Sequence, residues 1–370
     1  MDILYKILID PFVQMGQAPD LLVQTLWEGL VGGVLYSLIA LGFVLIFKAS
    51  GVFNFAQGIM VVFAALTLVG LHEKGISPAL SIAIIAAGLA LLAWRFFGRN
   101  KEAAPRPWVG IAVLAFGIFA FALLNRDIPA LLALVITVGV MFVLALTIEK
   151  VVLRPLINQP DIILFMATFG LTYFLIGFGE FVFGGDPKVM PAEGLGLSKG
   201  TLDFKILGGL VSVQKIDVAA AVIASLMVIG LGVFFSKTRI GRALRAVADS
   251  HQAALSVGIS LEQIWVIVWF AAGLVALVTG IMWGARSDVS FALDVIALKA
   301  LPVLILGGFT SIPGAIVGGL IIGTGEKLWE FYWGPLMGGG TDSWFAYVIA
   351  LIFLLFRPQG LFGERIIERV

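Results

Sequence analysis

Hydrophobic residues occur along the chain in long runs that are separated by short polar or glycine-rich stretches. A helix needs roughly 17 to 25 mainly apolar residues to cross the hydrocarbon core of a bilayer. The pattern therefore predicts an all-α polytopic membrane protein, with a single transmembrane domain over residues 1–370. About eleven segments are expected, some of them short or broken, at residues 20–47, 53–71, 78–97, 107–124, 127–151, 161–183, 216–236, 263–285, 294–309, 313–334 and 343–357.

Composition supports the same class of protein. Hydrophobic residues make up 60% of the chain and charged residues 13%, and the mean hydropathy is +1.07. These values exclude a water-soluble fold of this length. The formal net charge is +1 and the charges lie mainly between the apolar runs, so the chain offers no basic face for nucleic acid. Membrane lipid is the expected surrounding.

The distribution of Lys and Arg predicts the orientation of the segments. Cytoplasmic loops carry an excess of these residues, and alternate loops of the predicted topology hold the larger basic groups. This places the N-terminus outside and the C-terminus in the cytoplasm. The basic residues of the predicted cytoplasmic side are Lys48; Arg95, Arg99, Lys101 and Arg106; Lys150 and Arg154; Lys237, Arg239, Arg242 and Arg245; and Arg357, Arg365 and Arg369.

Two further stretches depart from a simple row of membrane helices. Residues 184–215 mix charged residues with several glycines, and are predicted to form an extracytoplasmic loop where an external partner could bind. Residues 78–124 consist of two apolar runs joined by a basic turn, and are predicted to be a two-helix insertion. Because the insertion adds an even number of crossings, it leaves the orientation of the later segments unchanged.

A basic segment at residues 236–262 lies between two apolar runs and is predicted to form a cytoplasmic loop with a short amphipathic helix. Two interpretations fit this pattern: a helix that lies on the lipid headgroups, or a surface that docks to a soluble partner. The apolar positions are Ile240, Leu244, Val247 and Leu255, and the polar positions include Arg242, Arg245, Asp249 and Gln252.

Polar side chains inside irregular stretches are candidates for lining a translocation path. Asn54 and Gln57 lie in residues 51–58 and Thr310 lies in residues 307–314, and both stretches read G-x-F-[NT]-x-x-x-G. Irregular backbone at membrane depth is tolerated only where protein or a water-filled cavity satisfies its hydrogen bonds, so such stretches often line transport paths. For the two amides, a role in the path and ordinary packing are equally good interpretations.

Thr168 and Glu326 complete the candidate set for the path. Thr168 is a hydroxyl within an apolar helix, where the commonest role is to satisfy a local carbonyl. A central charged residue stranded in lipid costs several kcal/mol, with estimates starting at about 2.5 kcal/mol. Glu180, Lys299, Glu326 and Lys327 should therefore face the interior or an interface. Glu326 is expected to be a polar anchor of the pore or of a subunit interface. The alternative is a salt bridge at a helix end with Lys327 or a nearby Arg.

Several sequence blocks, taken together, resemble the branched-chain amino-acid ABC transporter permeases of the LivH type. The A-A-x-x-x-G run at residues 253–258 resembles the segment by which ABC importer permeases dock into their ATPase subunits. The other blocks follow in the order of the family, at 31–58 (VGGVLYSLIALGFVLIFKASGVFNFAQG), 149–156 (EKVVLRPL), 236–260 (SKTRIGRALRAVADSHQAALSVGIS), 299–328 (KALPVLILGGFTSIPGAIVGGLIIGTGEKL) and 356–363 (FRPQGLFG).

The resemblance implies an importer in the cytoplasmic (inner) membrane of a bacterium or archaeon. A LivH-like and a LivM-like permease would pair around the path, two cytoplasmic ATPases would bind ATP and Mg, and an extracytoplasmic binding protein would deliver the substrate. The chain itself would hold no cofactor. The ATPase-coupling residues implied are Arg242, Arg245, Asp249, Ala253, Ala254 and Gly258.

Substrates of the family are leucine, isoleucine and valine by default, and the resemblance extends to permeases for urea, amides and aromatic or carboxylic acids. The chain departs from the family at Gln57, where a His is common, and at Gln252, where importer loops commonly have an acidic residue. The first departure removes a titratable group from the expected path and leaves the substrate preference open.

Two other classes of protein are weaker alternatives. An ion-coupled secondary transporter should show inverted halves and ligands for the coupling ion, and a membrane-embedded enzyme needs a convergent acid, base or metal cluster. The sequence shows neither pattern. Its two histidines, His72 and His251, are far apart and it has no cysteine, so a metal site has little support. The chain is therefore predicted to be a transport subunit without enzymatic activity.

Overall fold

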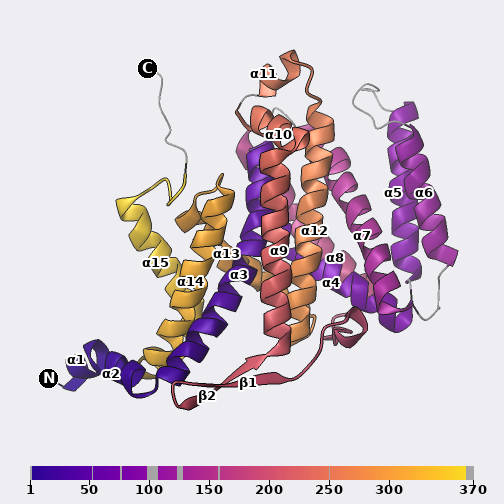
Figure 1. Cartoon of the computed structure of the whole chain (residues 1–370). Helices are drawn as coiled ribbons and strands as arrows, with labels where there is room; N and C mark the ends of the chain where they lie inside the picture. Colours follow the sequence, from indigo (N-terminus) through magenta and orange to yellow (C-terminus); the bar gives the residue numbers. More distant parts are fainter. Residues whose placement is uncertain are drawn as a thin grey trace, which may run out of the picture. The chain divides into compact units, whose positions relative to one another are not determined.

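The computed structural model describes residues 2–51, 53–75, 77–97, 107–122, 128–156, 159–249 and 251–363. It confirms an all-α polytopic membrane fold, since every predicted segment contains a helix (Figure 1). These helices are α3 (Pro19–Ser50), α4 (Gln57–Lys74), α5 (Pro78–Phe97), α6 (Pro107–Ala122), α7 (Ala130–Thr147), α8 (Asp161–Phe183), α9 (Lys215–Lys237), α12 (Leu261–Ser287), α13 (Val295–Gly307), α14 (Ile312–Tyr332) and α15 (Asp342–Phe356).

The helices differ in their capacity to cross a bilayer. Among the described residues, five helical stretches are long and apolar enough to span, namely α3, Ala130–Leu156, Ile162–Phe183, α9 and Gln263–Ser287. The stretch Phe291–Gly307, which contains α13, and α14 form a further pair that is bent by 115° at a short break. Helices α4, α5, α6 and α15 are shorter apolar helices. The prediction that some segments are short or broken is therefore confirmed.

Residues group into two compact units whose segments interleave along the chain. Unit 1 comprises Met1–Val44, Leu197–Gly241 and Val295–Val370, and unit 2 comprises Leu45–Gly196 and Arg242–Asp294. Helix α3 begins in unit 1 and ends in unit 2.

Glycines bring α3 and α14 of unit 1 into backbone contact. A Cβ on Gly33 would lie 2.6 Å from the carbonyl oxygen of Gly319, and a Cβ on Gly29 would lie 2.8 Å from the Cα of Thr324. Gly29 and Gly33 are four residues apart, as are Gly319 and Gly323, so each helix presents a G-x-x-x-G face. Small residues at this spacing let membrane helices approach closely, and the two helices run antiparallel in this contact.

Helix α13 packs against α14 and α15 (Figure 1). Gly307 contacts Gly314 at the turn. A side chain at Gly318 would collide with the carbonyl oxygen of Val303. Ser311 is the N-cap of α14, because its hydroxyl accepts from the amide of Gly314 at 3.0 Å. This cap supplies one of the hydrogen bonds that an exposed helix start would lack within a membrane.

A β-hairpin occupies part of the stretch predicted as an extracytoplasmic loop. Strands β1 (Thr201–Ile206) and β2 (Gly209–Gln214) pair antiparallel in unit 1, and α9 begins directly after β2. Leu207 and Gly208 connect the strands with positive φ values of 52° and 87°. Two left-handed residues in a two-residue turn match the twist of a hairpin. Gly209 packs against the side chain of Asp20, so the hairpin lies beside the start of α3.

Two short helices precede α3 and were not predicted. They are α1 (Asp2–Leu8) and α2 (Asp10–Gln17), in unit 1. The indole nitrogen of Trp333 donates to the carbonyl of Ile7 at 2.9 Å, and the ring of Trp333 meets that of Phe12 edge to face at 5.7 Å. The end of α14 therefore fixes both short helices at this end of unit 1.

In unit 2, α4 packs against α7, α8 and α12, and α5 pairs with α6. Gly280 lets the backbones of α12 and α4 touch, because a Cβ at this position would lie 2.5 Å from the carbonyl oxygen of Val61. The predicted helices of the insertion, α5 and α6, meet closely where Gly88 faces Leu114 and Gly117 faces Ile85. Residues 98–106 and 123–127 lie outside the described residues. That the pair is an insertion stays a prediction.

The expectation that Lys150 and Arg154 lie in a loop is wrong. Helix α7 continues without a loop into a π-helix, η1 (Ile148–Leu153), and a 3-10 turn, η2 (Arg154–Leu156). Both Glu149 and Lys150 are buried in η1, and Oε1 of Glu149 lies 4.0 Å from Nε of Arg154. A π-turn lets polar side chains leave the regular helical register, and such turns are frequent at functional sites.

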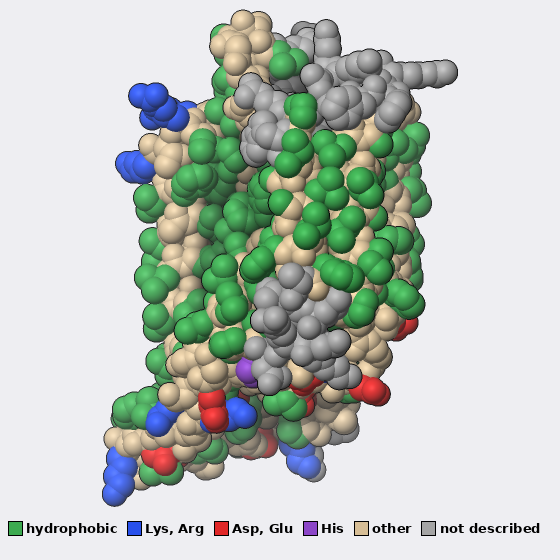
Figure 2. All heavy atoms as spheres, turned by 90° about the vertical axis from the view of Figure 1, so that its right-hand side faces the viewer, with side chains coloured by type: hydrophobic (Ala, Val, Ile, Leu, Met, Phe, Trp, Pro, Cys, Tyr) green, Lys and Arg blue, Asp and Glu red, His purple; other side chains and the backbone are tan. Residues whose placement is uncertain are grey.

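Hydrophobic side chains cover the middle of the face that α5 and α6 present, as Figure 2 shows. Ile82 and Leu89 of α5 are exposed there, as are Ile111, Ile118 and Phe119 of α6. Exposed apolar surface of this extent is unfavourable in water. It is the surface expected of helices that face lipid.

The close contact of α3 with α14 predicts that only one of two adjacent glycines is sensitive to substitution. A methyl group on Gly33 would collide with the backbone of α14, so Gly33→Ala should lower the stability by about 1–3 kcal/mol. Gly32→Ala is the matched control, because nothing lies within 4 Å of the added methyl group. The apparent melting temperature of each purified variant in detergent measures the difference. Equal melting temperatures would contradict the contact.

Candidate functional site

A short break separates α3 from α4 in unit 2 and contains the predicted pair Asn54 and Gln57. Both side chains are fully buried. Oδ1 of Asn54 accepts from the amide of Ala56 at 3.2 Å, and its Nδ2 lies 3.4 Å from Oε1 of Gln57. Nε2 of Gln57 donates to the carbonyl of Ala272 in α12 at 3.3 Å. The two amides thus join the irregular backbone to the start of α4 and to α12.

Thr168 of α8 completes this cluster. Its hydroxyl accepts from the amide of Phe55 at 3.2 Å and lies 2.9 Å from the carbonyl of Phe165. The expected satisfaction of a local carbonyl is confirmed. In addition, the ring of Phe55 lies between α8 aromatics, 5.9 Å from Phe165 and 5.1 Å from Phe169.

The polar groups of this cluster hydrogen-bond mainly to the backbone of the chain itself. Irregular backbone cannot face lipid, and these side chains supply the partners that water would otherwise provide. Packing is thus the better supported interpretation for Asn54 and Gln57. That the cluster also borders a translocation path stays a prediction.

A second polar cluster lies in unit 1 around Glu326 of α14, whose side chain is 2% exposed. Oε1 of Glu326 accepts from the hydroxyl of Tyr36 in α3 at 3.1 Å and from Nζ of Lys299 in α13 at 2.9 Å. Lys299 also donates to Oδ2 of Asp342, at the start of α15, at 2.8 Å. One ammonium group therefore holds two carboxylates, and four helices meet at the cluster.

This arrangement corrects the expected partner of Glu326. The salt bridge is formed with Lys299, 27 residues earlier on another helix, and not with the neighbouring Lys327. A charge pair across helices fixes their packing, whereas a pair on one helix would not. Oε2 of Glu326 has no hydrogen-bond partner in the part of the chain that the structure describes.

Tyr36 and Asp342 were missed by sequence reasoning. Tyr36 lies within an apolar run, and 290 positions separate it from Glu326, so no local pattern connects the two residues. Asp342 precedes an apolar helix and resembles an ordinary residue of a helix start. The position of Lys299 in an apolar helix was the available signal, because an ammonium at membrane depth requires acceptors nearby.

The remaining predicted residue of the path, Thr310, is half-buried in the turn between α13 and α14. The rise of a helix puts it about 20 Å from Glu326 along α14. The structure therefore brings together Asn54, Gln57 and Thr168 in unit 2, while Thr310 and Glu326 lie apart in unit 1. Glu180, a further ionisable candidate, is exposed near the end of α8.

The basic segment predicted at 236–262 forms α10 (Arg239–Asp249) and α11 (His251–Ser256). Thr238 makes the corner between α9 and α10. Its hydroxyl donates to the carbonyl of Phe234 at 2.6 Å and accepts from the amide of Gly241 at 3.1 Å. One side chain thus closes the first helix and caps the second. Gly241 has no room for a side chain against the backbone of Phe235.

Helix α10 is amphipathic, as predicted. Leu244 and Val247 are buried and Ile240 is half-buried, whereas Arg242 and Arg245 are exposed. The prediction that Leu255 extends the apolar face is wrong, since this side chain is 55% exposed.

The A-A-x-x-x-G run also closes the end of α11, and its docking role stays a prediction. Ala254 is 1% exposed, so its methyl group is not available to a partner. The amides of Gly258 and Ile259 return to the carbonyls of Leu255 and Ala254 at 3.0 Å, and Gly258 has a φ of 81°. These bonds form a Schellman cap, in which glycine is preferred for its left-handed conformation. The side chains of Asp249, Gln252 and Ala253 lie outside the described part.

In the described part of the chain, no group of three or more His, Cys, Asp or Glu residues is placed to hold a metal ion.

Comparison with known proteins assigns the family. A family model described as "Branched-chain amino acid transport system / permease component" matches residues 109–357, which is more than half of the chain. The chain belongs to this permease family. The matched region contains most of α6 and all of α7 to α15, and it includes Thr168, Lys299 and Glu326 of the two polar clusters. No solved structure matches the permease.

Three curated relatives resemble the permease over almost its whole length. BraD of Pseudomonas aeruginosa, a high-affinity branched-chain amino acid transport system permease protein, is 26% identical over 94% of this chain and 97% of its own. LivH of Escherichia coli K12, described in the same words, is 24% identical with the same coverage. A probable LivH permease of Methanocaldococcus jannaschii is 27% identical over 93% of this chain and 95% of its own.

Thr168 and Thr172, one turn apart on α8, provide a matched test of the break before α4. Thr168→Val would leave the buried amide of Phe55 without an acceptor, so the permease should lose about 1–3 kcal/mol of stability. Thr172→Val removes only a bond to the carbonyl of Thr168 within the same helix and should lose less. Melting temperatures in detergent compare the two variants, and equal losses would contradict a bracing role for Thr168.

Lys299→Met should destabilise the permease strongly, by about 3–5 kcal/mol, because it leaves Glu326 buried without its cation. Adding Glu326→Gln to this variant should restore much of the loss, since the uncompensated charge is then removed. Lys327→Met is the control and should change the stability by less than about 0.5 kcal/mol in lipid-free detergent. A larger effect for Lys327→Met than for Lys299→Met would refute the assignment of the ion pair.

Proposed function

We propose that the permease is a membrane subunit of an ATP-driven importer for branched-chain or other hydrophobic amino acids. The observation that carries the proposal is the resemblance over nearly the whole length to BraD and LivH proteins, whose names state branched-chain amino acid transport. The permease would form the translocation path with a second permease, in the inner membrane of a bacterium or archaeon.

Energy would come from two separate ATPase subunits that bind ATP and Mg. The GTGEKL stretch at residues 323–328 lacks the G-x-x-x-x-G-K-[ST] spacing of a phosphate-binding loop and lies within an apolar helix. The docking surface would be the segment 238–260. Its exposed groups include the basic Arg242 and Arg245 and the apolar Leu255 and Val257, and Val257 is 74% exposed. Exposed apolar side chains in a polar segment are typical of an interaction surface.

A binding protein outside the membrane would deliver the substrate to the opposite side. The arrangement of unit 1 supports an external N-terminus and a cytoplasmic C-terminus. Helices α1 and α2 and the β-hairpin lie at one end of the unit, and the C-terminal stretch lies at the other, where Leu361 and Phe362 bond to Leu306 and Gly307 (Figure 1). The hairpin would then belong to the external face.

ATP hydrolysis by the purified complex tests the proposal. The permease, co-expressed with the genes beside it, should purify with two ATPase subunits, and a binding protein loaded with leucine should raise their hydrolysis rate. An isolated permease that forms no such complex, or a rate that the loaded binding protein leaves unchanged, would contradict the assignment.

Leu255→Asp or Val257→Asp should weaken the association of the permease with the ATPases. Both side chains are exposed, so the substitutions should leave the fold intact, while a charge in the centre of an interface should reduce co-purification by at least about ten-fold. Lys199→Asp, on the exposed loop before β1, is the control for an added negative charge. Full retention of the ATPases by Leu255→Asp and Val257→Asp would move the docking surface elsewhere.

A further inference from the structure

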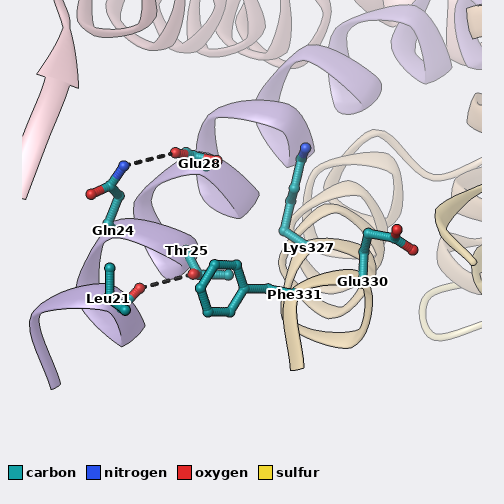
Figure 3. A pocket seen from close by; sticks show the side chains of 7 residues that line it. All are labelled: Leu21, Gln24, Thr25, Glu28, Lys327, Glu330 and Phe331. Atoms are coloured by element: carbon teal, nitrogen blue, oxygen red, sulfur yellow. Dashed lines mark hydrogen bonds between the residues drawn. The ribbon is translucent and has the colours of Figure 1, made fainter. Parts of the chain in front are cut away.

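A small hollow lies between α3 and α14, at the end of unit 1 that carries α1 and α2 (Figure 3). Its volume is about 160 Å³. Leu21, Gln24, Thr25 and Glu28 line it from α3, and Lys327 and Phe331 line it from α14. A cavity of about 150 Å³ can hold a molecule the size of benzene, so the hollow can take a small polar group but not a peptide.

Opposite charges line this hollow without neutralising each other. Lys327 was expected to face the interior or an interface, and it is exposed in the described chain. Its ammonium makes no hydrogen bond or ion pair with any residue that the structure describes, although the charge of Asp342 is near enough to attract it. Glu28 accepts one hydrogen bond, from Nε2 of Gln24 at 3.3 Å, and forms no ion pair with Lys327. A ligand that complements both groups must carry an anion and a hydrogen-bonding cation.

Glu330 borders the hollow, but its carboxylate is bound by backbone amides and is not available to a ligand. Its carboxylate accepts from the amides of Gly340, Thr341 and Asp342 at 2.9, 2.7 and 3.0 Å. Figure 3 shows this carboxylate pointing away from α3. The charges available to a ligand are therefore one cation and one carboxylate, on facing helices.

Aromatic residues mark this end of unit 1 as the level of the lipid headgroups. Trp27 lies beside Glu28 in the sequence, and the ring of Trp329 stacks on Trp333 at 5.1 Å. Trp and Tyr are enriched at membrane–water interfaces. Helices α1 and α2, held here by Trp333, expose the apolar side chains of Leu8 and Phe12, as helices lying in the interface do.

We propose that the hollow binds the headgroup of an ethanolamine phospholipid. Lys327 would bind the phosphate, and the carboxylate of Glu28 would accept hydrogen bonds from the primary ammonium group. The exposed apolar side chains of Leu21 and Phe331 would contact the first part of the acyl chains. A glycerol headgroup has no cation for Glu28, and a choline headgroup has no N–H to donate. The site does not depend on the transport function.

Native mass spectrometry of the full-length permease complex tests the site. Delipidated complex is titrated with dioleoyl lipids that carry ethanolamine, glycerol or choline headgroups. The ethanolamine lipid should bind most tightly. Lys327→Gln should weaken its binding about ten-fold, the effect of one lost charge-assisted hydrogen bond. Glu28→Gln should weaken the binding of the ethanolamine lipid by a similar factor and leave the binding of the glycerol lipid unchanged. The preference for ethanolamine should then disappear.

Controls separate the site from general charge effects and from poor folding. Lys205→Gln, at an exposed lysine of β1, should bind like the parent, and Lys327→Arg should retain binding. On the unsubstituted chain, carbodiimide should couple the lipid amine to Glu28. Unchanged ethanolamine binding in Lys327→Gln, a preference that survives Glu28→Gln, or displacement of the lipid by free leucine would overturn the proposal. The last result would assign the hollow to an amino-acid zwitterion.

Discussion

The ammonium group of Lys299 sets the packing of unit 1, because a charge within a membrane helix must find its partners inside the protein. It binds Glu326 of α14 and Asp342 of α15 at 2.9 and 2.8 Å, so the three C-terminal helices converge on one point. Tyr36 of α3 reaches the same carboxylate. Removing the cation would leave a carboxylate that is 2% exposed without compensation. Glu326 therefore serves as an anchor between helices.

The glycine faces of α3 and α14 make that cluster geometrically feasible. The backbones touch at Gly33 and Gly319, and in this antiparallel alignment the hydroxyl of Tyr36 reaches the carboxylate of Glu326. In unit 2, buried polar groups around the start of α4 also find their hydrogen-bond partners within the protein, but the partners are backbone amides and not charged side chains. The irregular backbone before α4 is buried, and the side chains of Asn54 and Thr168 satisfy the amides of Ala56 and Phe55. In both units, buried polar groups hold helices in defined positions, which is a precondition for the two-state movements of a transporter.

Local patterns in the sequence were sufficient to predict the helices but not their contacts. The apolar runs determined all eleven segments, and the Asn54–Gln57 pair was recognised because amides are unusual at membrane depth. The pairing of Lys299 with Asp342 depends on how α13 and α15 pack against each other, which no local pattern specifies. Charge alone predicts a loop for Lys150, whereas η1 buries this side chain. The motif around Ala254 has a local explanation in the Schellman cap at Gly258, and whether it also docks to an ATPase stays a prediction.

The central claim is that ATP hydrolysis in partner subunits drives amino-acid uptake through this permease. The most direct measurement is uptake of radiolabelled leucine by proteoliposomes that contain the purified permease complex, with the binding protein added outside and ATP enclosed. The account predicts uptake that requires both enclosed ATP and the binding protein, and that is insensitive to dissipating proton and sodium gradients. Uptake by the permease alone, driven by an ion gradient without ATP, would contradict it.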